Sequence, residues 1–376
     1  MAVTPDTVRE RLQTIKGPDG VDLVASGKLS DVVVTDGKVF FSLTVDAAEA
    51  KAWEEVRKSA EAAVRAIPGV ASVLVALTAE RRGGAQTPLQ PQPRPGAAAP
   101  RGGEGPRPAP GIPGIEAVIA VASGKGGVGK STTAVNLALG LRDLGLKVGV
   151  LDADIYGPSM PRLLAIKGRP ETIGGRTLRP MEAYGMKVMS IGFLVDEETP
   201  MIWRGPMVMS AITQMLREVE WGKLDVMVVD MPPGTGDAQL TLAQQVPLAG
   251  AVIVSTPQDL ALIDARRGIA MFRRVDVPVL GLVENMSYFL CPHCGKRTDV
   301  FSHGGAKAEA ERLGVPFLGE VPLEPVIRET SDAGLPIVAT QPDSAQAAIY
   351  RHIAARVRDG LAQKRARSAP KIIIES

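Results

Sequence analysis

Short runs of consecutive apolar residues alternate with segments of helical periodicity after residue 115. There are five such runs: 118–122, 147–151, 226–229, 251–255 and 279–283. Strands buried on both faces have this pattern, because helices cover both sides of a parallel sheet. Apolar residues also recur every four positions from Ile349 to Leu361, which predicts a helix over 344–364. We therefore expect an α/β domain with a doubly wound, mostly parallel sheet over residues 115–365.

The first 80 residues follow a different pattern. Thr4-Pro5 predicts a capped helix start. Two valine-rich segments flank the Asp36-Gly37 step and predict a hairpin. A second helix is expected over 47–67 and a last strand over 71–77. The order α-β-β-α-β predicts a small α+β domain over residues 1–80.

A segment rich in proline and glycine separates the two domains. Residues 81–114 hold nine prolines and eight glycines without apolar periodicity, so they cannot bury enough surface to fold. We expect a flexible linker here and a short tail over 366–376. The linker contains five arginines: Arg81, Arg82, Arg94, Arg101 and Arg107. They could form a nucleic-acid arm, but we favour a solvated tether.

Composition narrows the class of protein. The 376 residues carry a formal net charge of +2, and aromatic residues make up 4%. Neither value favours nucleic-acid binding. No apolar run approaches the ~20 residues of a membrane span, and the N-terminus lacks the apolar stretch of a signal peptide. We expect a cytoplasmic protein that binds neither membrane nor nucleic acid.

A glycine-rich loop stands between the run 118–122 and a helical segment. Gly124 to Ser131 fits the pattern G-x-x-x-x-G-K-[ST]. Glycines let several backbone N–H groups converge on phosphate oxygens, Lys130 supplies a charge to the β- and γ-phosphates, and the Ser131 hydroxyl can ligate Mg²⁺. The expected nucleotide-binding residues are Gly124, Lys125, Gly126, Gly127, Val128, Gly129, Lys130, Ser131 and Thr132.

Acidic residues follow two of the predicted strands, at the edge where α/β sheets bind ligands. Asp152 and Asp154 end the run 147–151, and Asp230 ends 226–229 at the Walker B position. We expect Asp230 to hold Mg²⁺ through water, Asp152 to support the ion and Asp154 to orient the attacking water. Gly234 is expected to offer its N–H to the γ-phosphate.

Lys125 is an addition that the minimal loop does not require. A second lysine so close to Lys130 would be repelled unless an anion lay between them or it pointed toward another chain. The sequence resembles the deviant Walker A loop, G-K-G-G-V-G-K-[ST]-T. In that class, two subunits face each other and this lysine reaches the partner's nucleotide. The resemblance therefore implies a homodimer in which Lys125 acts across the interface.

The chain has only two cysteines, Cys291 and Cys294. In a reducing compartment, such a pair is typical of a metal ligand set or a redox couple. A cubane iron–sulfur cluster normally needs four thiolates, so two copies or a second protein would have to contribute. Zinc with His293 or His303 and a thioredoxin-like couple are the alternatives that we consider weaker.

Several strings together resemble the Mrp/ApbC family of iron–sulfur cluster carrier ATPases. They are DADIYGPS (152–159), WRGPM (203–207), DMPPGTGD (230–237) and ENMSYFLCPHCG (284–295). The resemblance implies ATP on the loop with Asn285 near the adenine. It also implies a homodimer whose Cys291 and Cys294 hold a [4Fe–4S] cluster bridged between the two subunits.

The N-terminal domain resembles the PaaD/SufT-like iron–sulfur assembly domain. The resemblance rests on the Gly17-Pro18-Asp19 turn, the 22–27 stretch and the α-β-β-α-β order. Some members of that family carry a reactive cysteine, and this copy has none. A docking role is therefore expected, with a regulatory or solubilising appendage as the alternative.

The expected function is slow ATP hydrolysis that drives conformational change in an iron–sulfur cluster carrier. Its partners would be apo iron–sulfur proteins and upstream cluster assembly proteins. One alternative is a MinD/ParA-like positioning ATPase that binds membrane or DNA, in which the cysteines have no purpose. Another is a scaffold that binds nucleotide without hydrolysing it.

Overall fold

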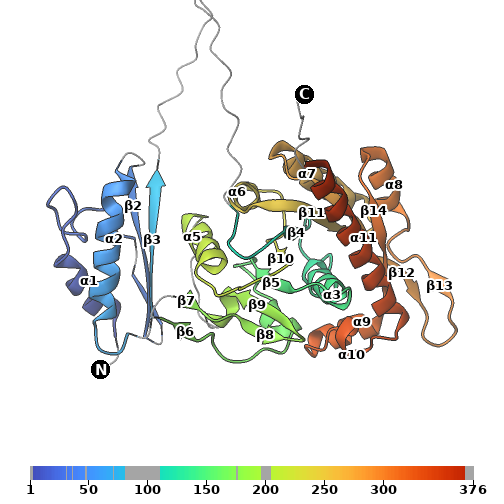
Figure 1. The fold of residues 1–376 in the computed structure, drawn as a ribbon, viewed down its shortest axis with the longest axis horizontal. Coiled ribbons are helices and arrows are strands. Elements are labelled where there is room, and N and C mark those ends of the chain that lie inside the picture. Colours follow the sequence, from blue (N-terminus) through green and yellow to red (C-terminus); the bar gives the residue numbers. More distant parts are fainter. Residues whose placement is uncertain are drawn as a thin grey trace, which may run out of the picture. The chain divides into compact units, whose positions relative to one another are not determined.

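The computed structural model describes residues 3–80 (apart from 31, 36, 47, 48 and 71), 111–174, 177–195 and 205–368. Two compact units are present, and each is described by itself (Figure 1). Most of the predicted linker, including its five arginines, and residues 369–376 of the predicted tail lie outside the described residues. Within the described part of the chain, no helix is long and apolar enough to cross a membrane.

The N-terminal unit has the predicted α-β-β-α-β order. Its elements are α1 (Pro5–Gln13), β1 (Val33–Thr35), β2 (Lys38–Asp46), α2 (Ala50–Arg65) and β3 (Ser72–Glu80). The side chain of Thr4 accepts a hydrogen bond from the Thr7 N–H and caps α1, as its position before a proline predicts. The hairpin β1–β2 is antiparallel, and β3 returns parallel to β2 after α2. Both helices contribute to one core, which includes Leu12 and Trp53.

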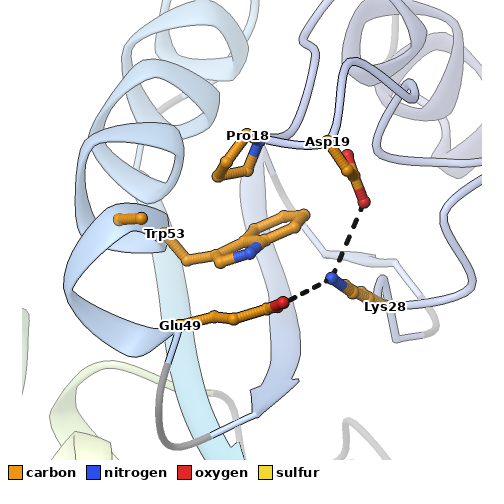
Figure 2. Close-up of a pocket in the computed structure, with 6 residues that line it drawn as sticks. Pro18, Asp19, Lys28, Glu49 and Trp53 are labelled. Carbon is orange, nitrogen blue, oxygen red and sulfur yellow. Dashed lines mark hydrogen bonds and ion pairs between the residues drawn. The ribbon is translucent and has the colours of Figure 1, made fainter.

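A shallow cleft of about 220 Å³ lies beside Trp53 in this unit (Figure 2). The ammonium of Lys28 lies 4.4 Å from the centroid of the Trp53 ring. It also lies 3.1 Å from Glu49 Oε2 and 3.7 Å from Asp19 Oδ2. A side chain at Gly17 would approach the Trp53 ring within 2.7 Å, so the turn requires glycine there. The charged groups of the cleft thus pair with one another. The packing of Gly17 on Trp53 holds the turn against α2.

The larger unit is built on one sheet with the order β13-β12-β11-β4-β10-β5-β9-β8, and β14 also pairs with β12. Its strands are β4 (Val118–Ala122), β5 (Val148–Asp152), β8 (Met181–Ala183), β9 (Met186–Ser190), β10 (Val226–Asp230), β11 (Leu248–Ser255), β12 (Val279–Leu290), β13 (Arg297–Thr298) and β14 (Phe317–Leu323). Only the pairings β8–β9 and β12–β13 are antiparallel among these described strands. Every residue of β4, β5 and β10 is buried, so both faces of the sheet are covered. The predicted mostly parallel α/β fold is confirmed.

Helices and a small hairpin connect the strands. They are α3 (Lys130–Asp143), α4 (Met160–Leu163), β6 (Thr172–Ile173), β7 (Thr177–Leu178), η1 (Ile191–Phe193), α5 (Gly205–Arg217), α6 (Asp237–Gln245), α7 (Asp259–Arg274), α8 (Gly305–Leu313), α9 (Pro325–Asp332), α10 (Ile337–Thr340) and α11 (Ala345–Ser368). The predicted C-terminal helix is α11, which packs closely along α3 (Figure 1). A side chain at Gly140 of α3 would come within 2.8 Å of Ala354, so glycine permits this approach.

The sheet register brings the acidic strand ends together. Asp230 at the end of β10 is paired with Val121 of β4 on one side and with Asp152 of β5 on the other. The loop after β4 is the predicted phosphate loop. The carboxyl edge of three adjacent strands therefore assembles the site.

Candidate functional site

The predicted phosphate loop joins β4 to α3. Gly127 and Gly129 have φ values of 79° and 80°, a left-handed conformation in which glycine is favoured. A side chain at Gly124 would approach the backbone of Asp264 within 2.3 Å, and one at Gly129 would approach Asn285 Nδ2 within 2.1 Å. Three glycines of the motif are thus required by backbone conformation or by close packing. The predicted strand–loop–helix arrangement is confirmed.

A cleft of about 270 Å³ opens above this loop. The residues that line it are Ser123, Lys125, Gly126, Gly127, Gly129, Lys130, Ser131, Thr132, Asp154, Ser159, Leu163 and Pro233. Most of the residues predicted to bind nucleotide lie on this wall, together with Asp154 from the loop after β5. Ser123, Ser159, Leu163 and Pro233 are new to the set.

Lys130 connects the loop to the acidic strand ends. Its Nζ lies 2.6 Å from Asp230 Oδ1, 3.8 Å from Asp154 Oδ2 and 3.1 Å from the Ser131 hydroxyl. The side chains of Lys130 and Asp230 are 6% and 0% exposed, so the ion pair is buried. The lysine that is expected to bind phosphate therefore forms a buried ion pair with Asp230.

The second carboxylate oxygen of Asp230 does not take part in the ion pair with Lys130. This atom, Oδ2, is buried and has no hydrogen-bond partner among the described residues. A buried carboxylate oxygen without a partner is costly, and a hydrated Mg²⁺ ion would satisfy it. Ser131, whose hydroxyl can ligate Mg²⁺, lines the same cleft. The donor set thus fits the predicted magnesium site.

Asp154 and Asp152 differ in what surrounds them. Burial raises the pKa of Asp154, and the nearby Lys130 partly offsets this effect. Burial and the charge of Asp230 raise the pKa of Asp152 to about 7. Asp152 accepts hydrogen bonds from the backbone N–H groups of Asp154, Ser159 and Met160 at 2.9–3.2 Å. Its predicted support of Mg²⁺ stays a prediction, because both carboxylate oxygens already hold the loop that carries Asp154.

Ser190, which the sequence interpretation missed, completes this arrangement. Its hydroxyl donates to Asp152 Oδ2 at 2.9 Å and accepts from the Gly192 N–H. Ser190 ends β9 and is paired with Asp152 across the sheet. The rule that points to Asp152, a polar residue at the carboxyl end of a parallel strand, could have found Ser190 as well.

Two further predicted residues make contacts within the chain. The N–H of Gly234, expected at the γ-phosphate, donates to the Ser123 carbonyl at 2.9 Å. The Lys125 ammonium lies 3.5 Å from Gln258 Oε1 at the start of α7. Lys125 nevertheless lines the cleft, so its expected contact with a nucleotide across a dimer remains a prediction.

Asn285 lies on β12 and contacts the phosphate loop. Its Nδ2 donates to the Val128 carbonyl at 2.8 Å, and the residue is 7% exposed. The expected proximity to adenine stays a prediction, but the contact itself ties β12 to the loop. The next residue, Met286, has a φ of 57°, and the pairing of β12 with β14 shifts register between Asn285 and Phe289.

The two cysteines lie in the turn between β12 and β13. The Cys291 N–H donates to the Lys296 carbonyl at 3.0 Å, and the Gly295 N–H donates to the Cys291 carbonyl at 2.8 Å. Cys294 is exposed and Cys291 is half-buried. Hydrogen bonds from the backbone of Cys294 and His293 lower the pKa of the Cys291 thiol. The turn thus holds both thiols next to the strand that carries Asn285, with Cys294 exposed and Cys291 half-buried.

The cysteine turn offers too few ligands for a zinc site within one chain. Within the described part of the chain, no group of three His, Cys, Asp or Glu side chains is arranged to hold a metal ion. His303 instead pairs with Glu320, with Nε2 and Oε2 3.0 Å apart. Arg297 stacks over the Tyr288 ring at 4.2 Å. Two thiols of one chain therefore leave a tetrahedral or cubane site half filled.

Glu284 is a second residue that the sequence interpretation missed. It is fully buried, and its carboxylate accepts from the Gly304 and Ala306 N–H groups at the start of α8. It also accepts from the Ser287 hydroxyl at 2.6 Å. Glu284 and Asn285 therefore fix β12 to α8 and to the phosphate loop. An acidic residue that ends a run of apolar residues is the signal that could have found it.

The comparisons with known proteins agree with this geometry. Residues 114–358 match the family model described as NUBPL iron-transfer P-loop NTPase. Residues 5–75 match the model described as iron-sulfur cluster assembly protein. The predicted resemblances of both domains are thus confirmed.

Similar proteins include an iron-sulfur cluster carrier protein from Synechocystis sp., which is 44% identical over 365 residues, 94% of this chain and 98% of that protein. The iron-sulfur cluster transfer protein NUBPL from Mus musculus is 57% identical over 248 residues, 65% of this chain and 78% of that protein. A solved nucleotide-binding protein from Archaeoglobus fulgidus in complex with ADP is 40% identical with a TM-score of 0.55, covering 63% of this chain and 92% of that chain. The chain belongs to the family of NUBPL iron-transfer P-loop NTPases.

Proposed function

We propose that this protein is an ATP-hydrolysing carrier that binds an iron–sulfur cluster and transfers it to apoproteins. Two relatives that are 44% and 57% identical are a cluster carrier and a cluster transfer protein. The observation that carries the proposal is the placement of two thiols, one half-buried and one exposed, in the turn that follows β12, the strand whose Asn285 bonds to the phosphate loop. A positioning ATPase would have no use for those thiols.

The nucleotide site would work by releasing its internal ion pair. Lys130 would bind the β- and γ-phosphates in place of Asp230, and Ser131 and Asp230 would hold hydrated Mg²⁺. A bound Mg²⁺ ion would neutralise charge on the phosphates. ADP in the Archaeoglobus fulgidus protein supports a nucleotide of this size in the site.

Hydrolysis would follow in-line attack by water that Asp154 orients. The water oxygen bonds to the γ-phosphorus while the bond to the β,γ-bridging oxygen breaks. The electron pair stays with ADP, and the water proton leaves with inorganic phosphate. Burial raises the pKa of Asp154 above its ordinary value, which makes its carboxylate a better hydrogen-bond acceptor for that water.

The cargo would be a [4Fe–4S] cluster held between two copies of the chain. Each copy supplies Cys291 and Cys294, which together give the four thiolates that such a cluster needs. The lowered pKa of Cys291 favours the thiolate that binds iron. Lys125 would reach the partner's nucleotide in the same dimer. Upstream assembly proteins would load the cluster, the N-terminal unit would serve as a docking module, and the cytoplasm is the expected compartment.

Cluster transfer with and without MgATP tests the proposal. The cluster-loaded full chain is mixed with an apoenzyme that gains activity on receiving a [4Fe–4S] cluster. We expect MgATP to change the transfer rate by about fivefold or more. Lys130→Ala should abolish both ATP hydrolysis and the effect of MgATP on the transfer rate, and the variant should still bind the cluster. Equal rates with and without MgATP in the wild type would contradict the coupling, and an active Lys130→Ala variant would contradict the site.

A further inference from the structure

Ser159 lines the nucleotide cleft, and its hydroxyl is the feature of interest. Its hydroxyl oxygen is one of three buried side-chain polar atoms that have no hydrogen-bond partner among the described residues. A second of the three is Asp230 Oδ2, which we assign to hydrated magnesium. Ser159 itself lines the cleft together with Lys130 and Asp154. Buried polar groups are nearly always paired, so the absence of a partner for this hydroxyl requires an explanation.

The hydroxyl has not been used to cap the helix that follows. Ser159 precedes α4, a position where serine often accepts a hydrogen bond from a backbone N–H with its side chain, but it makes no such bond here. Asp152 does this work instead, because its Oδ2 accepts from the N–H groups of Ser159 and Met160. The Ser159 hydroxyl therefore does not cap the helix, although serine often does so at this position.

The backbone around Ser159 is held firmly. The Ser159 N–H lies 2.9 Å from Asp152 Oδ2, and Asp152 in turn accepts from Ser190 on the neighbouring strand. Asp152 also accepts from the Asp154 N–H. One buried carboxylate therefore fixes both Asp154 and Ser159 relative to the sheet. Rotation about a single side-chain bond is the motion left to the hydroxyl.

The location selects one part of the nucleotide. Asp154 Oδ2 lies 3.8 Å from the Lys130 ammonium, the group that serves the β- and γ-phosphates. Asp154 and Ser159 both line the cleft, and the γ-phosphate would lie beside Asp154, whereas the backbone of the glycine loop would bind the phosphates nearer the sugar. We propose that the Ser159 hydroxyl donates a hydrogen bond to an oxygen of the γ-phosphate and so distinguishes ATP from ADP. This inference rests on the proposed ATPase function.

The test compares the affinities of Mg·ATPγS and Mg·ADP for the full chain by isothermal titration calorimetry. Ser159→Ala should weaken ATPγS binding by about tenfold, as expected for a lost hydrogen bond to a charged oxygen, and change ADP binding by less than about twofold. Ser159→Thr keeps the hydroxyl and should restore ATPγS affinity to within about threefold. Tyr156→Phe is the matched control: it removes a hydroxyl from an exposed side chain of the same segment, and both affinities should stay within about twofold.

A structural role for the hydroxyl gives a different pattern. Because Ser159→Ala removes a buried hydroxyl that has no partner, the melting temperature of the nucleotide-free protein should stay the same or rise. A lower melting temperature with equal loss of ATPγS and ADP affinity would overturn the inference, as would unchanged ATPγS affinity. If the wild type binds neither nucleotide, the proposed function itself fails. If it binds both and Ser159→Ala does not discriminate between them, only the role of Ser159 fails.

Discussion

The buried pair of Lys130 and Asp230 makes a quantitative prediction about the nucleotide-free protein. At 2.6 Å, the Coulomb attraction is about 6 kcal/mol for an effective dielectric constant of 20, and the cost of desolvating both charges offsets much of it. Lys130→Met leaves a fully buried carboxylate without its cation. We expect this variant to lose roughly 3–5 kcal/mol of unfolding free energy.

Substitution of the other member of the pair, Asp230, should lower the unfolding free energy by less. In Asp230→Asn, Lys130 keeps Asp154 as a second acidic neighbour at 3.8 Å, so the loss should be about 1–2 kcal/mol. The double variant carries neither charge and should be more stable than Lys130→Met alone by about 2 kcal/mol or more. Urea unfolding of nucleotide-free protein at pH 7, followed by far-ultraviolet circular dichroism, measures the unfolding free energies of the wild type, the two single variants and the double variant. Wild-type stability in Lys130→Met, or no recovery in the double variant, would show that the buried pair does not stabilise the fold.

Three further predictions concern neighbouring parts of the site. Gly129→Ala should abolish nucleotide binding measured by calorimetry, because the new Cβ would meet Asn285 Nδ2 at 2.1 Å and φ is 80°; ordinary affinity would contradict this. The pKa of Asp152 is raised from 3.8 to about 7, so the folded protein binds the proton more tightly than the unfolded chain. Its contribution to stability is full below about pH 4 and falls by up to about 4 kcal/mol as the pH rises to 7. Asp152→Asn should flatten that dependence in urea midpoints at pH 5 and pH 8, and an unchanged slope would count against it. Arg297→Ala removes the guanidinium stacked 4.2 Å over Tyr288 and should speed amide hydrogen exchange in the cysteine turn, with Arg297→Lys intermediate; equal exchange in all three proteins would show that the stack does not hold the turn.

The sequence pattern predicted the buried strands and the residues at their carboxyl ends. The run 118–122 became β4 with the same limits, and Asp230 stands at the end of β10 beside the phosphate loop, as a Walker B residue should. Apolar runs and glycine spacing carry this information, because burial on both faces and left-handed backbone constrain residue type directly.

Contacts between distant segments could not be predicted this way. The run 279–283 predicts a short strand, yet β12 extends to Leu290 because β13 pairs with its far end. The N–H of Gly234 points to Ser123, and Asp152 braces the Asp154 loop. Each depends on which groups meet after folding, and a single sequence contains no periodic signal for such pairings.

Cluster loading tests whether two copies of the chain share one cluster through Cys291 and Cys294. The full chain is loaded anaerobically with ferrous iron and sulfide, and its iron, sulfide and molecular mass are measured together. The account predicts a mass of two chains, about two iron atoms per chain and visible absorption of a [4Fe–4S] cluster, all lost in Cys291→Ser. A colourless monomer, or zinc held by a single chain through Cys291 and Cys294, would contradict it.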